Sequence, residues 1–419
     1  EERLSQETFE ANVSRIVRWA ATRYVFYQEW FHDLGVRVDD IRGQAELALI
    51  PPVVKQINLD DQVRAPPFGR LVPGDLRDRI RYVLRTSGTT GMPTMMFWTA
   101  HDWLLAVELL ARNLWAAGLR PGMGLLHLWP TGASQIATLW VRDAAERCAA
   151  VPIIEGGRDF QADPAKCARF LCELAKGLEL GAITSFPISE ALGREIAALG
   201  GQSPLRFLLL GGQPTTPEMR ARLKRWHPHA QVFDIWASTE AQTLGQCTAG
   251  RYHMQEDLVV HQVVDGHHKP AAAGSKGELV MTSLIQYTQP LIRFATGDVI
   301  VNTVEDGPCA CGRHQRVFVH PVLGRITDKF VAGGKAFLVS DVQSALSAAG
   351  MMGKFQITAR KDQLGERLEL RVESDPGPKE EDLAAALQAE LGVPVQVSIT
   401  PPGSIPMTTS VKYSQIRWI

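Results

Sequence analysis

The stretch RTSGTTGMPT, from Arg85 to Thr94, has the residue types of a loop that binds an anion. It contains three hydroxyl side chains and two glycines: Ser87, Thr89, Thr90, Gly88 and Gly91. Glycines let the backbone approach a ligand closely, and successive N–H groups in such a loop can form a concavity for an anion. The preceding RIRYVL is typical of a strand, and the following MMFWTAHDW of an extended piece that leads into a helix. Without a lysine, the loop is not a GxxxxGK[ST] phosphate loop, and a surface turn is the alternative.

Cysteine and histidine residues in two separate segments form a second candidate site. The segments read Cys247-x5-His253 and Cys309-x-Cys311, with His314 nearby as a less favoured substitute ligand. Thiolates together with one imidazole suit tetrahedral zinc, and four protein ligands would make the ion structural because no position stays open. The β-rich chain between the segments could bring them together. Free buried cysteines that only pack are the alternative.

Four further stretches follow the hydroxyl-rich loop: DIWASTE (234–240), ATGDV (295–299), LGRITDKF (323–330) and PMTTSVK (406–412). Together with the loop and in this order, they resemble the motifs of the adenylate-forming superfamily of acyl-CoA ligases, luciferases and adenylation domains. Within it, the chain is most similar to the phenylacetate–CoA ligase-like branch, through FYQEWFHDLGVRVDDIR, PLIRFATGDV and PCACGR. The resemblance covers nearly the whole chain.

The resemblance implies a role for each motif. The loop would hold the β- and γ-phosphates of ATP, with Thr90 among the catalytic residues, and Glu240 would bind Mg²⁺. Asp298 would accept hydrogen bonds from both ribose hydroxyls, which suits an acceptor-only carboxylate. Lys412 would stabilise the α-phosphate during adenylation. The other nucleotide-binding residues implied are Gly212, Asp234, Trp236, Ala237, Ser238, Thr239 and Arg325. The Cys/His set matches a structural zinc site seen in part of the branch.

Three positions depart from the family pattern. Trp236 stands where the family usually has tyrosine against adenine, although an indole can offer the same stacking face. Val411 replaces a glycine before Lys412, and Thr327 replaces the first aspartate of the hinge, whereas Asp328 keeps the second. The following VAGGKAFL lacks the residues that line the approach of the pantetheine arm in relatives.

The activity implied is activation of a carboxylic acid by ATP to an acyl adenylate with release of pyrophosphate, followed by transfer to CoA. By resemblance, the acid is an aryl or arylacetic acid. The altered hinge leaves a different acceptor open, such as a carrier-protein thiol, an amine or another small nucleophile. A catalytically silent nucleotide-binding homologue is the third reading, disfavoured because the loop, Glu240, Asp298, Arg325 and Lys412 are all present.

Candidate residues for the acid pocket follow short apolar runs that read as parallel strands, because ligands bind at the carboxyl ends of such strands. They are Trp129, Thr131, Gly132, Phe186, Pro187, Gly211 and Gln213. This set suggests a flat, partly apolar slot with no conspicuous charged partner for a substrate amine.

Composition restricts the other function classes. The chain has 419 residues, a formal charge of −1 and 21% charged residues, which gives no electrostatic reason to expect nucleic acid. The sequence contains no run of about 18 apolar residues, so no membrane span is expected. Only six cysteines are present, which favours a reducing, cytoplasmic setting. A homodimer is possible.

The expected fold class is α/β, with a large N-terminal domain over 1–324 and a small, mobile α+β lid domain over 325–419. A helical cap over 1 to about 80 would include one helical stretch from Glu7 to Trp30, with its aromatic cluster in the core. Strands at 124–129, 149–154, 181–186, 206–211 and 232–237 would alternate with helices, of which 102–117 and 164–178 are recognisable. A smaller antiparallel β-subdomain would occupy about 245–322. The lid would contain helices at 341–349 and 380–391 and strands at 355–361, 367–374 and 395–400.

Overall fold

The fold is taken from a computed structural model that describes residues 5–85, 93–129, 135–154, 163–240, 242–362, 365–374, 377–406 and 415–417. Ser87, Gly88, Thr89, Thr90, Gly91, Thr131, Gly132 and Lys412 lie outside the described residues. The roles of the hydroxyl-rich segment and of the C-terminal lysine therefore stay predictions. Among the described residues, no helix is long and apolar enough to cross a membrane.

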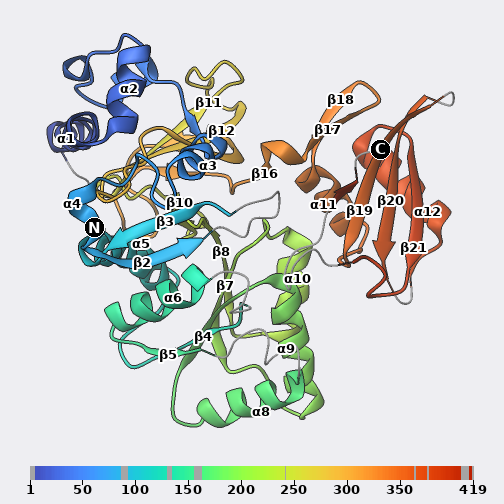
Figure 1. The fold of residues 1–419 in the computed structure, drawn as a ribbon. Coiled ribbons are helices and arrows are strands. Elements are labelled where there is room, and N and C mark those ends of the chain that lie inside the picture. The colour runs from blue at the N-terminus through green and yellow to red at the C-terminus, as the bar shows by residue number, and fades with distance from the viewer. Residues whose placement is uncertain are drawn as a thin grey trace.

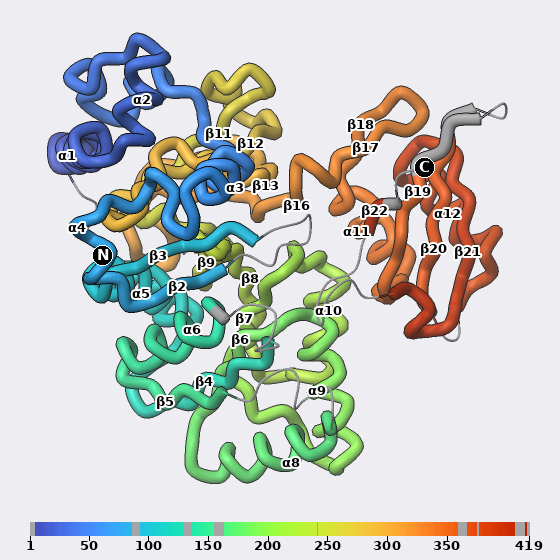
Figure 2. The backbone as a smooth tube through the Cα atoms, in the orientation of Figure 1, coloured from blue at the N-terminus to red at the C-terminus, as the bar shows by residue number. Residues whose placement is uncertain are grey.

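The N-terminal segment forms two helices, α1 (Gln6–Arg23) and α2 (Val25–Asp33), and the prediction of a single helical stretch is wrong. Tyr24 breaks the helix with extended backbone angles, φ −114° and ψ 116°. Its ring is fully buried and its hydroxyl donates a hydrogen bond to the carbonyl of Tyr287, a contact that a continuous helix would not supply. The aromatic cluster is mainly buried, as predicted, and shares a core with Val260, Leu284 and Ile292. Figures 1 and 2 show the two helices that carry it at the periphery of the N-terminal part.

The chain then runs through short elements to the central hairpin. They are η1 (Val38–Asp40), η2 (Glu46–Leu49), β1 (Val53–Val54), α3 (Lys55–Arg64) and α4 (Gly74–Arg77). Strands β2 (Ile80–Arg85) and β3 (Met95–Thr99) pair antiparallel, and α5 (Ala100–Ala116) follows directly. The strand before the hydroxyl-rich segment, and the strand and helix after it, are those predicted from the sequence.

A six-stranded sheet in the order β5-β4-β6-β7-β8-β9 forms the middle of the molecule. Its strands are β4 (Gly124–His127), β5 (Val151–Ile153), β6 (Leu180–Thr184), β7 (Leu205–Leu210), β8 (Gln231–Ala237) and β9 (Thr243–Gly245). The first five are parallel, as predicted, and β9 is antiparallel. Between them run α6 (Gln135–Arg147), α8 (Pro164–Leu174), α9 (Phe186–Ala198) and α10 (Pro217–Trp226).

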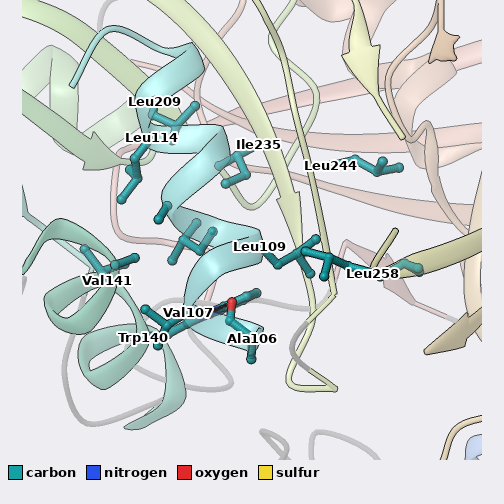
Figure 3. Close-up of a cluster of buried hydrophobic side chains, with 14 of the residues drawn as sticks. Ala106, Val107, Leu109, Leu114, Trp140, Val141, Leu209, Ile235, Leu244 and Leu258 are labelled. Atoms are coloured by element: carbon teal, nitrogen blue, oxygen red, sulfur yellow. Dashed lines mark hydrogen bonds between the residues drawn. The ribbon is translucent and has the colours of Figure 1, made fainter. Parts of the chain in front are cut away.

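Alternating side chains of this sheet enter two separate apolar cores. On one face, Leu209 and Ile235 pack with Leu109 and Leu114 of α5, as Figure 3 shows. On the other face, Leu208 and its neighbours pack against α8, α9 and α10. Because both faces of the sheet are covered, the sequences of its strands are near-continuous apolar runs.

The β-subdomain is built on β11 (Val259–Val264), β12 (Lys276–Ser283) and β13 (Phe294–Val301), which pair antiparallel as predicted. β13 also pairs with β1, in parallel, and with β16 (Gly324–Arg325). A smaller antiparallel sheet contains β10 (Tyr252–His253), β15 (Val317–Phe318) and β14 (Val304–Glu305). The pairing of β1 with β13 ties the N-terminal segment to this subdomain.

The C-terminal unit has its own apolar core, formed by residues between Phe330 and Ile416 (Figure 1, orange to red). Its elements are η3 (Ile326–Asp328), β17 (Lys329–Ala332), β18 (Lys335–Leu338), α11 (Val339–Ala348), β19 (Phe355–Asp362), β20 (Gly365–Glu373), α12 (Glu380–Leu391), β21 (Val395–Thr400) and β22 (Ile416–Arg417). Helix α11 contacts the N-terminal part, where the hydroxyls of Ser347 and Thr216 lie 2.5 Å apart. The predicted α+β composition is confirmed, and the domain limits 1–324 and 325–419 stay a prediction.

Arg293 fixes the N-terminal segment to β13 from within the core. Only 1% of the residue is exposed, and its guanidinium donates hydrogen bonds to the carbonyls of Ala48, Ile50 and His268. Its own carbonyl accepts a hydrogen bond from Val53 at 2.8 Å. Burial lowers the pKa of this arginine, so its charge is retained at a cost that the carbonyl contacts offset.

Replacing Arg293 by methionine should lower the free energy of unfolding by roughly 2–4 kcal/mol, because buried carbonyls lose their donors. Urea unfolding monitored by tryptophan fluorescence measures the change. Arg225→Met, at an exposed position of α10, is the matched control and should be nearly neutral. Equal stabilities of the two variants would contradict the anchoring role.

Candidate functional site

The DIWASTE segment forms the end of β8 and a tight connection to β9. Trp236 lies opposite Leu244 in the β8–β9 pair, and the Ser238 N–H donates a hydrogen bond to the Gln242 carbonyl at 2.9 Å. Ala237, Ser238 and Thr239 therefore occupy the strand end and the turn, and their contact with a nucleotide stays a prediction. Glu240 follows in the same turn, with 7% of its side chain exposed.

Trp236, Asp298 and Arg325 come together from three strands. The Trp236 indole Nε1–H donates a hydrogen bond to Asp298 Oδ2 at 3.1 Å. The Arg325 Nε lies 3.7 Å from Asp298 Oδ1, because β13 and β16 pair these two residues directly. The arrangement places an aromatic ring, a carboxylate and a guanidinium side by side, which is the set that the sequence predicts around a nucleoside.

The Asp298 carboxyl is almost fully buried, with 6% of the residue exposed. Burial raises its pKa to about 6, although Arg325 and the hydrogen bond from Trp236 lower it, and the nearby Glu240 raises it further. A carboxyl with this pKa changes charge close to neutral pH, so its capacity to accept hydrogen bonds depends on pH.

Lys55 is a site residue that sequence reasoning missed. Its Nζ lies 3.9 Å from Glu240 Oε1, and it is the first residue of α3, directly after β1. The pairing of β1 with β13 brings it there, between segments far apart in the chain. The local sequence shows only a lysine after a proline pair, so no local signal could have identified it. A cation beside the Glu240 carboxylate adds positive charge where phosphates are expected.

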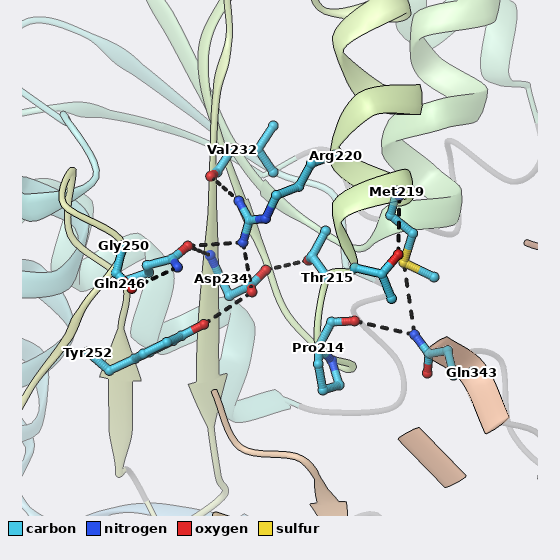
Figure 4. A network of polar contacts seen from close by, with 11 residues as sticks. Pro214, Thr215, Met219, Arg220, Val232, Asp234, Gln246, Gly250, Tyr252 and Gln343 are labelled. Carbon is cyan, nitrogen blue, oxygen red and sulfur yellow. Dashed lines mark hydrogen bonds and ion pairs between the residues drawn. The ribbon is translucent and has the colours of Figure 1, made fainter. Parts of the chain in front are cut away.

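Asp234 was predicted to contact the nucleotide, but its carboxylate is already occupied by protein donors (Figure 4). It accepts hydrogen bonds from the Thr215 hydroxyl, from Arg220 at 2.9 Å and from the Tyr252 hydroxyl at 3.2 Å. Only 6% of the residue is exposed. Its contact with a nucleotide stays a prediction, whereas its place in a buried polar network is observed.

Two of the predicted acid-pocket residues are in close contact. A Cβ placed on Gly211 would lie 2.5 Å from Trp129 Cζ2, so the indole lies against the glycine at the end of β7. His127 lies beside Trp129, with ring centroids 6.0 Å apart, and is fully buried. Burial lowers the His127 pKa to about 4, and neither ring nitrogen has a hydrogen-bond partner among the described residues. A neutral imidazole thus lies next to this part of the predicted pocket.

The other described pocket candidates do not join this contact. Phe186 is buried in the core on the opposite face of the sheet, and Pro187 is exposed in the first turn of α9. The Gln213 Nε2 lies 3.9 Å from Met219 Sδ. Gly212 has φ +97°, a left-handed conformation that favours glycine in this loop. The roles of these residues in acid or nucleotide binding stay predictions.

The two cysteine segments meet, as the sequence analysis anticipated. One ligand atom from each of Cys247, His253, Cys309 and Cys311 lies within 4.8 Å of the others. The sulfurs of Cys247 and Cys309 are 3.8 Å apart, and Cys311 Sγ lies 3.2 Å from His253 Nε2. A tetrahedral zinc ion with bonds of about 2.3 Å to sulfur requires sulfur atoms about 3.8 Å apart. The donor set and its spacing therefore fit one such ion.

The surroundings of these side chains also suit a metal. Burial, and then the charge of Arg313, lower the His253 pKa to about 3, which keeps the imidazole neutral as a ligand must be. The Cys309 N–H donates to the Arg313 carbonyl and the Gly312 N–H to the Cys309 carbonyl, forming a tight turn that holds both cysteines. His314 is not part of the observed cluster.

The hinge segment contains β16 and η3. Arg325 is the last residue of β16 and pairs with Asp298 of β13. The Thr327 hydroxyl lies 3.3 Å from Asp328 Oδ1. The threonine that replaces the family aspartate thus contacts its neighbour in the chain.

Comparison with known proteins finds relatives over nearly the whole chain, although no family model matches it. A phenylacetate-coenzyme A ligase from Thermus thermophilus is 27% identical over 442 residues, which cover 97% of this chain and 95% of the relative. A second, from Aromatoleum evansii, is 25% identical over 441 residues, with coverages of 99% and 95%. Among solved structures, 2-hydroxyisobutyryl-CoA ligase in the postadenylation state matches with a TM-score of 0.84 at 21% identity, covering 98% of this chain and 89% of that one.

The fold is therefore that of this acyl-CoA ligase, with a large N-terminal part and a small C-terminal unit. Over nearly its whole length, the chain is similar to phenylacetate-coenzyme A ligases, at 27% and 25% identity.

Cys309→Ser should abolish stoichiometric metal binding and lower the melting temperature, because the binding free energy of a structural metal contributes to folding. Protein purified without a metal-affinity step should contain about one zinc ion per chain by elemental analysis. Cys172→Ser, which changes a cysteine outside the cluster, should retain the metal. Zinc near zero in the unmodified protein, with all thiols titrating freely, would return these cysteines to simple packing.

Proposed function

We propose that this protein activates a carboxylic acid with ATP. The acid carboxylate attacks the α-phosphorus, pyrophosphate leaves, and the resulting acyl adenylate then transfers its acyl group to the thiol of CoA, releasing AMP. The acid is proposed to be aromatic, an aryl or arylacetic acid. The two full-length relatives named above are phenylacetate-coenzyme A ligases, which supports both parts of the proposal.

The single observation that carries the proposal is the meeting of Trp236, Asp298 and Arg325 beside Glu240. These residues come from distant motifs of the chain and lie in contact with one another. Together they offer groups that would recognise a nucleoside: a ring to stack on, a bidentate acceptor and a fixed cation. A carboxylate such as Glu240 suits Mg²⁺, which would neutralise phosphate charge when bound. Lys55 would add a second positive charge on the same side.

The acid is expected to bind beside the contact of Trp129 with Gly211, at the carboxyl ends of β4 and β7. Thr131, Gly132, Phe186, Pro187 and Gln213 stay candidates for the rest of this pocket. In the same proposal, the hydroxyl-rich loop holds the β- and γ-phosphates, and zinc has only a structural role. A cytoplasmic location and a homodimer stay predictions from the sequence.

A non-CoA acceptor is the second candidate. It is favoured by Thr327 in the hinge and by the match of 90% of this chain to a segment of a probable non-canonical nonribosomal peptide synthetase from Salinispora arenicola, at 25% identity. In this version, the first half-reaction is unchanged and a carrier-protein thiol, an amine or another small nucleophile takes the acyl group. A catalytically silent nucleotide-binding protein is the remaining alternative.

Pyrophosphate release across a panel of benzoates, phenylacetates, cinnamates and amino acids tests the proposal. Acid-dependent release that continues past one turnover only when CoA is added would support the acid–CoA ligase. Release that CoA does not accelerate, but a carrier protein or an amine does, would support the second candidate. No acid-dependent release with any member of the panel would contradict the proposed activation.

The raised pKa of Asp298 predicts a pH dependence of nucleotide binding. The ionised carboxylate accepts the ribose hydroxyls and the protonated form accepts poorly, so affinity should fall as the pH drops through about 6. Between pH 7 and pH 5 the loss should reach up to about tenfold for one such group. Calorimetric titration with ATP measures it.

The ATP γ-phosphate also titrates in this pH range and contributes to the pH dependence of affinity. Asp298→Asn measures that contribution alone, because an amide does not titrate. The variant should bind ATP more weakly at pH 7 and lose less affinity between pH 7 and pH 5 than the unmodified protein. Identical pH profiles would remove Asp298 from the ribose site.

Lys412→Ala should slow adenylate formation by on the order of 10²-fold or more, the scale of losing one group that stabilises transition-state charge. It should spare thioester formation from a preformed acyl adenylate. Single-turnover assays of the two half-reactions measure both effects. Equal losses in the two would indicate that the lysine has a structural role instead.

A further inference from the structure

A buried polar network centred on Asp234 joins three segments of the chain (Figure 4). Its carboxylate receives hydrogen bonds from Thr215, which precedes α10, from Arg220 within α10, and from Tyr252 in β10. Arg220 also donates to the Gln246 side-chain carbonyl at 3.0 Å, and the same carbonyl accepts the Asp234 N–H at 3.2 Å. The three hydrogen bonds thus connect three different segments of the chain to one strand, β8.

On one side, this network is continuous with the Cys/His cluster. Gln246 immediately precedes Cys247, and Tyr252 immediately precedes His253. The two network residues form a β-bridge with each other, and the Cys247 N–H donates to the Arg251 carbonyl at 2.8 Å. Two ligands of the proposed metal are therefore attached by single peptide bonds to residues that hold Asp234.

At its other end, the network includes the first residue of the proposed nucleotide motif, Asp234. Asp234 and Trp236 are two residues apart on β8, so their side chains point to the same face of the sheet. Trp236 in turn donates to Asp298, the proposed ribose acceptor. Asp234, which accepts the hydrogen bonds of Tyr252 and Arg220, is thus the neighbour of Trp236 on the same face of β8. The Trp236 ring is the one expected to stack on adenine.

We propose that Asp234, Arg220 and Tyr252 are positioning residues that couple metal binding at the Cys/His cluster to nucleotide binding at Trp236 and Asp298. The inference rests on the proposed function for the nucleotide site. A bound metal restrains Cys247 and His253, the network carries this restraint to β8, and the preorganised strand binds nucleotide more tightly. Because coupling free energies are reciprocal, nucleotide must strengthen metal binding by the same factor.

The coupling is measured on the zinc-loaded protein, which avoids the need for a stable metal-free form. The probe is the extent of zinc release to a competing chromogenic chelator at equilibrium, with and without saturating AMP. The apparent zinc dissociation constant of the unmodified protein should be at least about five times lower with AMP, the lower end of typical coupling between sites. The AMP dissociation constant is measured in parallel by calorimetry.

Tyr252→Phe removes only the hydroxyl that bonds to Asp234, and Arg220→Met removes the guanidinium. Both should still bind zinc and AMP, but AMP should change the apparent zinc dissociation constant by less than about twofold, because the connection between the sites is lost. Arg222→Met is the matched control on the same helix, since Arg222 pairs with Glu190 and not with the network. It should keep the full effect of AMP.

Each other outcome separates the claims. If AMP binds but does not change zinc release in the unmodified protein, or if Tyr252→Phe and Arg220→Met keep the full effect, the coupling is overturned and the proposed function stands. If the protein holds no zinc, the coupling is overturned as well. If neither AMP nor ATP binds, the proposed function itself fails.

Discussion

Strand β13 is hydrogen-bonded to three other strands, and the proposed nucleotide site depends on that pairing. One edge pairs with β12, and the other pairs first with β1 and then with β16. As a result, Lys55 follows a strand paired with β13, and Arg325 lies directly opposite Asp298, although distant parts of the chain supply these residues. The buried Arg293 guanidinium stabilises the same junction from inside. A change in this pairing would move the cation, the acceptor and the hinge together.

Much of the fold could be predicted from the sequence, because parallel strands buried on both faces read as short apolar runs between turn residues. The five parallel strands and the C-terminal α+β elements are confirmed at nearly the predicted positions. Helix α10 was not predicted, since only Met219 and Leu223 of its residues are buried and the apolar period is weak. The break at Tyr24 was missed because its cause is a contact with Tyr287, far along the chain.

The candidate site likewise contains residues that the sequence identifies and residues that only the tertiary structure brings in. Trp236, Asp298 and Arg325 were predictable because their motifs resemble those of the superfamily, and the Cys/His set because its donor types suit zinc. Lys55 and the roles of Arg220 and Tyr252 were not, since these depend on tertiary pairings that leave no local pattern. Asp234 shows the limit of motif reasoning most clearly. It lies inside a nucleotide motif, yet its carboxylate is satisfied by protein donors and serves the strand beneath the site.

The position of a labelled oxygen tests the central claim, activation through an acyl adenylate, most directly. With an acid labelled by ¹⁸O in its carboxylate, together with ATP and CoA, one labelled oxygen should appear in AMP, because the carboxylate oxygen that attacks the α-phosphorus stays on phosphorus when the thiol takes the acyl group. Mass spectrometry of the nucleotide products measures it. Label in orthophosphate accompanied by ADP, or unlabelled AMP despite thioester formation, would contradict the account.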